Sequence, residues 1–130
     1  MEEKIVMLVL CRRVLANLFI EHIQSNSQME AIGVYDFNNV KNMALIRQPT
    51  LALVEIPERH GEPAMEALDV CRNIKEVCHG CKIMLMCPEK DRKSVDVCVE
   101  AKQKGEIEDF VFYDTTPEYL SRKLEAMLPV

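Results

Sequence analysis

The sequence predicts a doubly wound α/β domain, in which five parallel strands form one sheet with helices on both faces. Short apolar segments alternate five times with longer segments whose apolar residues recur at helical spacing. Segments that are apolar along their whole length are typical of strands buried on both faces, as in parallel sheets. The length of 130 residues suits one core, so we expect a single domain over residues 1–130.

The first two strand–helix units cover the N-terminal third of the chain. An apolar run from Lys4 to Leu10 predicts a strand buried on both faces. Ala31 to Tyr35 predicts a second, shorter strand, and Asp36 is placed to cap the helix that follows and ends before Pro49. The apolar positions of these two helices are Val14, Leu15, Leu18, Phe19 and Ile23, and then Val40, Met43, Ala44 and Ile46.

Three more units follow in the same order. Strands are predicted at Leu51 to Ile56, Lys82 to Cys87 and Glu108 to Tyr113, and the fourth helix at Val95 to Lys104. The apolar positions of the third helix are Met65, Leu68, Val70, Cys71 and Ile74, and those of the fifth are Leu120, Leu124 and Leu128. Parallel neighbours need crossover connections, and these helices supply them.

Local signals mark the ends of three of these helices. Pro63 suits the first turn of the third helix, where a missing N–H costs nothing. Gly105 follows the fourth helix at the position that favours a left-handed backbone. Thr116 and Pro117 are typical of the N-cap and first residue of a helix, and so begin the fifth.

Charge and hydrophobicity exclude several classes of function. Lys and Arg number 16 and Asp and Glu 21, and a net charge of −5 lacks the basic surface that nucleic-acid binding needs. The longest apolar run, Ile5 to Leu10, is far shorter than the roughly 20 residues that cross a bilayer. Glu2 and Glu3 stand where an export signal has basic residues. We therefore expect a cytoplasmic protein that binds neither nucleic acid nor membranes.

The positions of the glycines argue against a bound cofactor. Gly33 is the first glycine of the chain, so no glycine-rich phosphate loop follows the first strand. Dinucleotide binding and P-loop chemistry are therefore poorly supported, and we predict no cofactor.

Six cysteines are compatible with a reduced, cytoplasmic protein. Disulfide frameworks belong to exported chains, so we interpret all six as thiols. Cys11, Cys87 and Cys98 lie in or beside apolar segments, where cysteine serves as a small hydrophobic residue.

The motif Cys78-His79-Gly80-Cys81 is compact enough to have chemistry of its own. A tetrahedral zinc site needs four ligands, and beyond this pair the fold would have to bring in Cys71, His79 or His60. Redox pairs place the reactive thiol at a helix N-terminus, whereas this motif falls between a helix end and a strand. We predict no metal site, and metal binding or thiol redox function at Cys78 and Cys81 is the alternative.

Ligands of open parallel sheets bind at the carboxyl ends of the strands, so the residues there carry the functional prediction. The segment Pro49 to Ile56 reads Pro-Thr-Leu-Ala-Leu-Val-Glu-Ile, and Gly105 precedes Asp109-Phe110-Val111. With five strand–helix units in this length, these features resemble the receiver domain of bacterial two-component response regulators. The resemblance implies the receiver, or flavodoxin-like, fold and a role in signal transduction.

The resemblance also assigns residues to the receiver phosphorylation site. It places Glu55 at the phospho-accepting aspartate, Cys87 at the serine or threonine after the fourth strand, and Tyr113 at the lysine after the fifth. The acidic pair of the family would fall within Val9 to Cys11, depending on register, with Leu10 and Cys11 as the equivalent positions, and no carboxylate occurs between Glu3 and Glu21. The resemblance therefore implies a degenerate receiver.

Elementary chemistry leads to the same expectation. Phosphoryl transfer to a carboxylate needs Mg²⁺ held by several oxygen ligands, and Glu55 alone would hold it poorly. We predict no Mg²⁺-dependent phosphorylation and no enzymatic activity. Arg12 or Arg13 could supply Glu55 with a positive partner instead. In the alternative arrangement, Glu55 is a solvated carboxylate and both arginines lie on the helix surface.

We expect the domain to act through protein association with a partner of a signalling pathway, or as a homodimer. The face used for output in the family consists of the fourth helix, the fifth strand and the fifth helix. Its candidate residues are Val95, Val99, Phe110, Phe112, Tyr119 and Arg122. Apart from the thiol alternative above, a residual receiver could accept phosphate at Glu58 or Asp114, a reaction that would need a metal site we do not predict.

Overall fold

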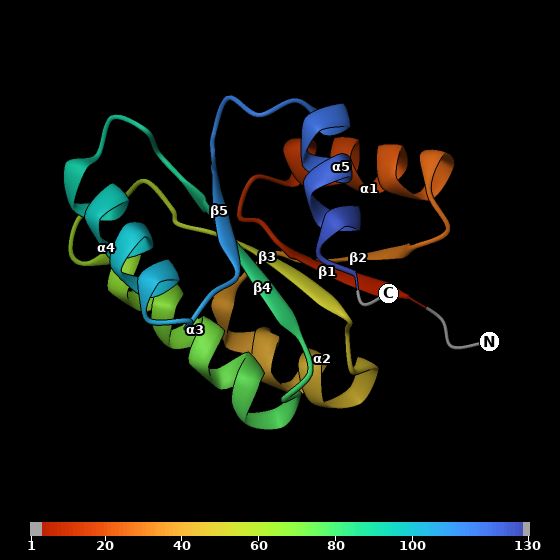
Figure 1. Ribbon diagram of the computed structural model, residues 1–130, viewed down its shortest axis with the longest axis horizontal. Coiled ribbons are helices and arrows are strands. Elements are labelled where there is room, and N and C mark those ends of the chain that lie inside the picture. Colours follow the sequence, from red (N-terminus) through yellow and green to blue (C-terminus); the bar gives the residue numbers. More distant parts are fainter. Residues whose placement is uncertain (1–3, 129–130) are drawn as a thin grey trace.

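The computed structural model describes residues 4–128 and shows a parallel sheet with helices on both faces (Figure 1). The elements are β1 Ile5–Val9, α1 Arg13–Asn26, β2 Glu30–Val34, the 3₁₀ turn η1 Phe37–Asn39, α2 Val40–Arg47, β3 Leu51–Glu55, α3 Pro63–Val77, β4 Lys82–Cys87, α4 Arg92–Gln103, β5 Asp109–Phe112 and α5 Pro117–Ala126. The predicted fold class is therefore confirmed. Among the described residues, no helix combines the length and apolar character needed to cross a bilayer.

The strand order is β2-β1-β3-β4-β5, and every neighbouring pair is parallel. The chain changes direction across the sheet between β1 and β3, which is where such folds gather functional residues. Val9 is level with Val54, Glu55 with Met86 and Cys87 with Phe112. The carboxyl ends of β1, β3, β4 and β5 therefore meet at one edge.

Two apolar clusters cover the two faces of the sheet. Helices α1 and α5 pack on one face through residues such as Phe19 and Leu124, and α2, α3 and α4 pack on the other through residues such as Ile74 and Cys98. Figure 1 shows the same division, with the sheet between the two groups of helices. All five residues of β1 and of β3 are buried, as a strand covered on both faces requires.

The local signals at the helix ends are mostly confirmed. The Thr116 side chain accepts a hydrogen bond from the backbone N–H of Tyr119 at 3.1 Å, and Gly105 follows α4 with φ of 76°. Asp36 differs from the expectation: its carboxylate accepts from the N–H of Asn38 and caps η1, which is inserted before α2.

Two element boundaries also differ from those predicted. Helix α4 begins at Arg92, before Val95, because its first three residues are polar and so give no apolar signal, although Ser94 among them is buried. Helix α5 ends at Ala126, and Leu128 packs against the core from beyond it.

Candidate functional site

Glu55 is the last residue of β3, and its side chain is buried at the edge of the sheet. Only 2% of it is exposed. Oε1 accepts a hydrogen bond from the backbone N–H of Cys11 at 2.8 Å, and Oε2 accepts one from Nε of Arg12 at 2.6 Å. Charge-assisted hydrogen bonds of this kind are short and strong. The expectation of a charge partner is therefore correct for Arg12, and Glu55 is not a solvated carboxylate.

The position of Arg12 depends on how α1 begins. Arg12 is the residue before the helix, with an extended backbone and no side-chain cap, so its side chain is free to lie across the strand ends. Its guanidinium lies over the ring of Tyr113 at 4.4 Å, and one terminal nitrogen is 3.9 Å from the sulfur of Met86. A carboxylate, an aromatic ring and a thioether thus fix the cation, while 46% of the side chain faces solvent.

Arg13 has a different contact and does not serve Glu55. Its guanidinium lies 4.2 Å from the centre of the Tyr35 ring. The Tyr35 ring in turn occupies the space beside Gly33, where an added Cβ would come 2.7 Å from the phenol oxygen. Gly33 therefore makes room for the Tyr35 ring, which contacts the Arg13 guanidinium.

Tyr113 follows β5 and links three strands at this edge. Its backbone N–H donates to the carbonyl of Cys87 at 3.1 Å, and its hydroxyl donates to the carbonyl of Ile56. Burial, followed by the negative charge of Glu55, raises the pKa of the Tyr113 phenol above its usual range. The phenol is therefore neutral, and the positive charge beside Glu55 comes from Arg12.

The residues at this edge do not fit Mg²⁺. Both oxygens of the one buried carboxylate are engaged by N–H donors, and a guanidinium lies beside it. Leu10 is fully buried and apolar, and Cys11 is exposed, contrary to its expected role as a small core residue. Burial and the charge of Glu55 raise the pKa of the Cys11 thiol, which favours its neutral form. Within residues 4–128, no three His, Cys, Asp or Glu side chains are arranged to hold a metal ion.

Cys87 lies beside this edge but points into the core. Its thiol donates to the carbonyl of Pro88 at 3.6 Å, and Cys98 on α4 belongs to the same core cluster. Both side chains are fully buried. The packing of α4 on β4 places both residues in this cluster, which sequence spacing does not predict.

The motif of Cys78 and Cys81 forms the turn between α3 and β4. Cys78 donates to the carbonyl of Pro49 at 3.4 Å, and Cys81 to that of Lys82 at 3.7 Å. Burial raises the pKa of Cys78 and raises that of Cys81 to about 12. Burial also raises the pKa of Cys71 on α3. Metal binding and thiol exchange both use the thiolate, which these surroundings disfavour.

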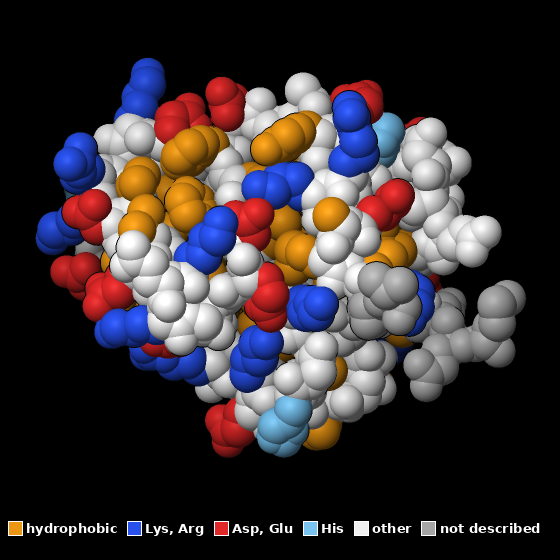
Figure 2. All heavy atoms as spheres, in the orientation of Figure 1, with side chains coloured by type: hydrophobic (Ala, Val, Ile, Leu, Met, Phe, Trp, Pro, Cys, Tyr) orange, Lys and Arg blue, Asp and Glu red, His pale blue; other side chains and the backbone are white. Residues whose placement is uncertain are grey.

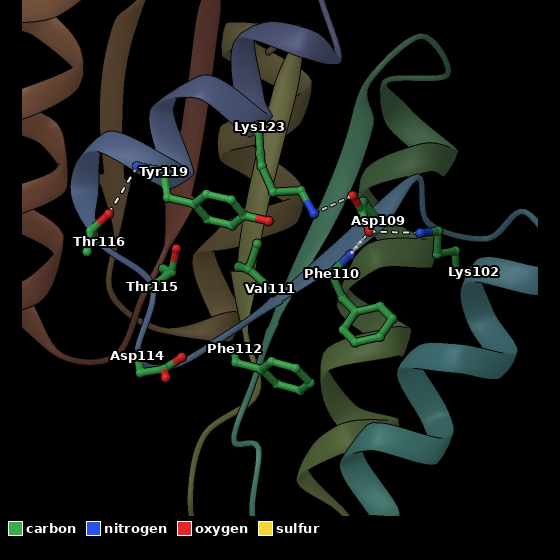
Figure 3. A pocket seen from close by; sticks show the side chains of 10 residues that line it. All are labelled: Lys102, Asp109, Phe110, Val111, Phe112, Asp114, Thr115, Thr116, Tyr119 and Lys123. Atoms are coloured by element: carbon green, nitrogen blue, oxygen red, sulfur yellow. Dashed lines mark hydrogen bonds and ion pairs between the residues drawn. The ribbon is translucent and has the colours of Figure 1, made fainter.

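A second feature is the surface formed by α4, β5 and α5, which we call the α4–β5–α5 face. Figure 2 shows hydrophobic side chains gathered over β5 between the two helices. Beside β5 lies a cavity of about 500 Å³ (Figure 3). Its lining residues are Lys102, Asp109, Phe110, Val111, Phe112, Asp114, Thr115, Thr116, Tyr119 and Lys123. Phe110 and Phe112 meet edge to face, with ring centres 5.9 Å apart.

The residues predicted for the α4–β5–α5 face differ in their exposure and in whether they line the cavity. Phe112 and Tyr119 are exposed by 39% and 53%, and Val99 is exposed on α4. Val95 is half-buried against the core, and Arg122 is exposed outside the cavity lining. Two side chains of α5 line the cavity, Tyr119 and Lys123, and Lys123 was not among the predicted residues.

Asp109 joins the three elements of the face. One oxygen is 3.0 Å from Nζ of Lys102 on α4, and the other is 2.7 Å from Nζ of Lys123 on α5, as Figure 3 shows. Burial acts to raise the pKa of Asp109, but the hydrogen bonds from Lys123 and Lys102 outweigh it and lower the pKa. A carboxylate between two lysines thus connects the neighbouring helices through β5.

Sequence comparison finds no matching family model and no matching curated protein. Solved structures do match. A response regulator from Thermotoga maritima is 16% identical over 97% of this chain and 98% of its own, with a TM-score of 0.77. A CheY-like response regulator receiver domain protein from Methanospirillum hungatei is 11% identical over 97% of both chains, with a TM-score of 0.73.

A third structure belongs to a family of redox sensors in the streptococci, described as evolved from two-component response regulators. It is 19% identical over 95% of this chain and 50% of its own, with a TM-score of 0.75. At these identities the likeness shows the fold. The chain therefore has the receiver fold that the sequence predicts, and function must be argued from the site.

Proposed function

We propose that this receiver-type domain transmits signals by protein association and is not switched by Mg²⁺-dependent phosphorylation. The observation that carries the proposal is the buried pair of Glu55 and Arg12, in which donors of the chain itself engage both carboxylate oxygens. The receiver fold supports the signalling class. The proposal includes no enzymatic activity and a cytoplasmic location, where the thiols are kept reduced.

The chemistry of the pair gives the proposal its reason. A phosphoryl acceptor must present a free carboxylate oxygen to the donor, next to a metal ion that neutralises developing charge. In this chain, Arg12 occupies the cationic position permanently and its partner oxygen is not free. Tyr113 holds the guanidinium from its other side. We infer that the strand ends keep one arrangement, independent of any phosphate donor.

The phosphorylation half of the proposal is tested by titrating the chain with Mg²⁺ and beryllofluoride while recording amide NMR spectra. We expect no saturable shifts at Glu55 or Phe110 at millimolar Mg²⁺. Incubation with a small phosphodonor should leave the intact mass unchanged, while a response regulator of known phosphorylation gains a phosphoryl group under the same conditions. Saturable shifts at the strand ends, or a phosphorylated Glu55, Glu58 or Asp114, would overturn it.

For the association half, we propose a second copy of this chain on the α4–β5–α5 face. The face has an apolar centre at Phe112 and Tyr119, flanked by cations and carboxylates such as Lys102 and Asp114. A surface with both charge signs around an apolar centre is able to complement itself about a two-fold axis. This makes a homodimer the form of association to test first.

Sedimentation velocity over rising protein concentration tests this arrangement. We expect a reversible dimer that Phe112→Asp or Tyr119→Asp abolishes. Val14→Asp is the matched control, because Val14 is 85% exposed but lies on α1. A chain that stays monomeric at all concentrations, or a dimer that Val14→Asp disrupts equally, would contradict the proposed interface.

The alternative of metal or thiol chemistry at Cys78 and Cys81 has less support, because burial favours their protonated forms.

A further inference from the structure

The strand β2 is one edge of the sheet (Figure 1), and part of its backbone points away from β1. The N–H of Glu30 donates to the carbonyl of Lys4 at 2.8 Å, on the side of β1. The carbonyl of Val34 likewise accepts a hydrogen bond from the residue after β1. Alternate residues of a parallel strand bond to alternate sides. The backbone groups of Ala31 and Gly33 therefore point to the open edge of the sheet.

The chain itself covers the first of these outward groups and leaves the next ones open. The side-chain oxygen of Gln24 on α1 accepts a hydrogen bond from the N–H of Ala31 at 3.3 Å. Within residues 4–128, the carbonyl of Ala31 and both backbone groups of Gly33 have no hydrogen-bond partner. A strand edge with unpaired N–H and C=O groups is able to add a further strand.

Beside this open edge lies a hollow of about 280 Å³ between β2 and α2. Gly33 and Tyr35 line the hollow from the sheet, and Met43 and Ile46 line it from α2. The Ile46 side chain is 74% exposed, so it offers an apolar surface to whatever lies along the edge. A strand added to β2 would cover this apolar surface.

Arg13 on α1 gives the hollow a positive charge. Its guanidinium lies 4.2 Å from the centre of the Tyr35 ring, and no carboxylate among the described residues pairs with it. The carboxylate in the lining, Asp36, accepts instead from the N–H of Asn38 and from Nδ2 of Asn39. Because Arg binds carboxylates through two parallel hydrogen bonds, the hollow favours an acidic ligand.

We propose that the β2 edge binds an extended segment of a partner protein in which acidic and apolar residues alternate. The segment adds a strand beside β2 through the backbone groups of Gly33. Successive side chains of a strand point to opposite faces, so one face of the segment meets Arg13 on α1 and the other meets Ile46 on α2. The acidic residues belong to the first face and the apolar residues to the second.

This site deepens the proposed association by naming a class of partner, and it rests on the proposed function only for its role in signalling. β2 and β5 are the opposite edges of the sheet, so a strand at β2 leaves the α4–β5–α5 face free. The two proposals can therefore fail separately. Phe112→Asp, which should abolish the dimer, should leave binding at β2 unchanged.

A synthetic peptide tests the proposal. The probe is acetyl-Thr-Val-Glu-Val-Glu-Val-Thr-amide, which alternates acidic and apolar residues. One control peptide carries lysine in place of both glutamates, and another has the same composition with the two glutamates adjacent. Each peptide is titrated into the isotope-labelled chain while amide NMR spectra are recorded. We expect saturable shifts at Ala31, Gly33 and Tyr35 with the probe only, and slower hydrogen exchange of the Gly33 amide in the complex.

Variants of exposed residues identify the contacts. Arg13→Gln and Ile46→Asp should each weaken binding of the probe by about fivefold or more. Arg122→Gln and Leu45→Asp are the matched controls, because both residues are exposed outside the hollow, and they should bind as the wild-type chain does. The proposal is overturned if the probe gives no saturable shift at Gly33, or if the lysine peptide binds equally tightly. It is also overturned if the Gly33 amide shifts with chain concentration alone, which would assign this edge to a second copy.

Discussion

Replacing Arg12 by alanine should destabilise the domain by about 2 kcal/mol. In the wild-type chain the Glu55 side chain is 2% exposed, and the substitution removes one of its two donors, leaving the N–H of Cys11. A hydrogen bond to a charged group is worth about 1.5–3 kcal/mol, and removing one partner of a fully buried pair costs about 3–5 kcal/mol. Because 46% of the Arg12 side chain faces solvent, water screens part of the interaction, and the lower range applies.

Urea unfolding measures this difference. With a denaturant slope of about 1–3 kcal/mol/M, a loss of about 2 kcal/mol lowers the midpoint by about 1 M at constant slope. Arg13→Ala is the matched control, since it removes the same charge one residue away and breaks only the contact with Tyr35, for a cost below about 1 kcal/mol.

A double-mutant cycle with Glu55→Gln isolates the pair itself. We expect a coupling free energy of at least about 1 kcal/mol between positions 12 and 55. The reasoning is refuted if the coupling is below about 0.5 kcal/mol, or if Arg12→Ala and Arg13→Ala unfold at the same urea concentration.

Three further outcomes follow from other contacts. Tyr113→Phe removes the hydrogen bond to the Ile56 carbonyl and should cost about 1 kcal/mol in urea unfolding; an unchanged midpoint would contradict that bond. Gly33→Ala should cost about 1 kcal/mol or more, because the new Cβ would displace Tyr35, and nuclear Overhauser contacts from that ring should change with it. Asp109 has a lowered folded pKa, so its stabilisation is present above the unfolded value near 3.8 and is lost as the pH falls through the folded value. The stability advantage of wild type over Asp109→Asn should therefore shrink on acidification, and an advantage constant down to pH about 2 would oppose this assignment.

The strands and several helix ends were predictable because their signals are local. Leu51–Glu55 is apolar up to its last residue. The glycine at 105 marks the end of one helix and the threonine at 116 the start of another, each by its residue type alone. The start of α4 was not predictable from hydrophobic spacing, since Arg92 and Lys93 are polar and exposed. Hydrophobic periodicity detects apolar residues, so a helix turn whose buried residue is the polar Ser94 leaves no periodic signal.

The candidate site was predictable to the level of residue position but not of contact. The absence of carboxylates after the first strand and the place of Glu55 follow from the sequence. Which arginine binds Glu55 depends on the residue at which α1 begins, because that decides whether Arg12 or Arg13 turns toward the strand ends. The contact of Lys123 with Asp109 arises from the packing of α5 beside β5 and has no counterpart in sequence spacing.

Because of the Glu55–Arg12 pair, each single substitution toward the acid pocket of a phosphorylated receiver would lower the folding stability of this chain. A carboxylate introduced first at Leu10 would be buried without a free cation beside it, at a cost of several kcal/mol. Removing Arg12 first leaves Glu55 underpaired, and total folding stability is only about 5–15 kcal/mol. Whichever substitution comes first, the single variant has a lower folding stability than the wild-type chain. Building an acid pocket at these strand ends without loss of folding stability therefore requires several positions to change together.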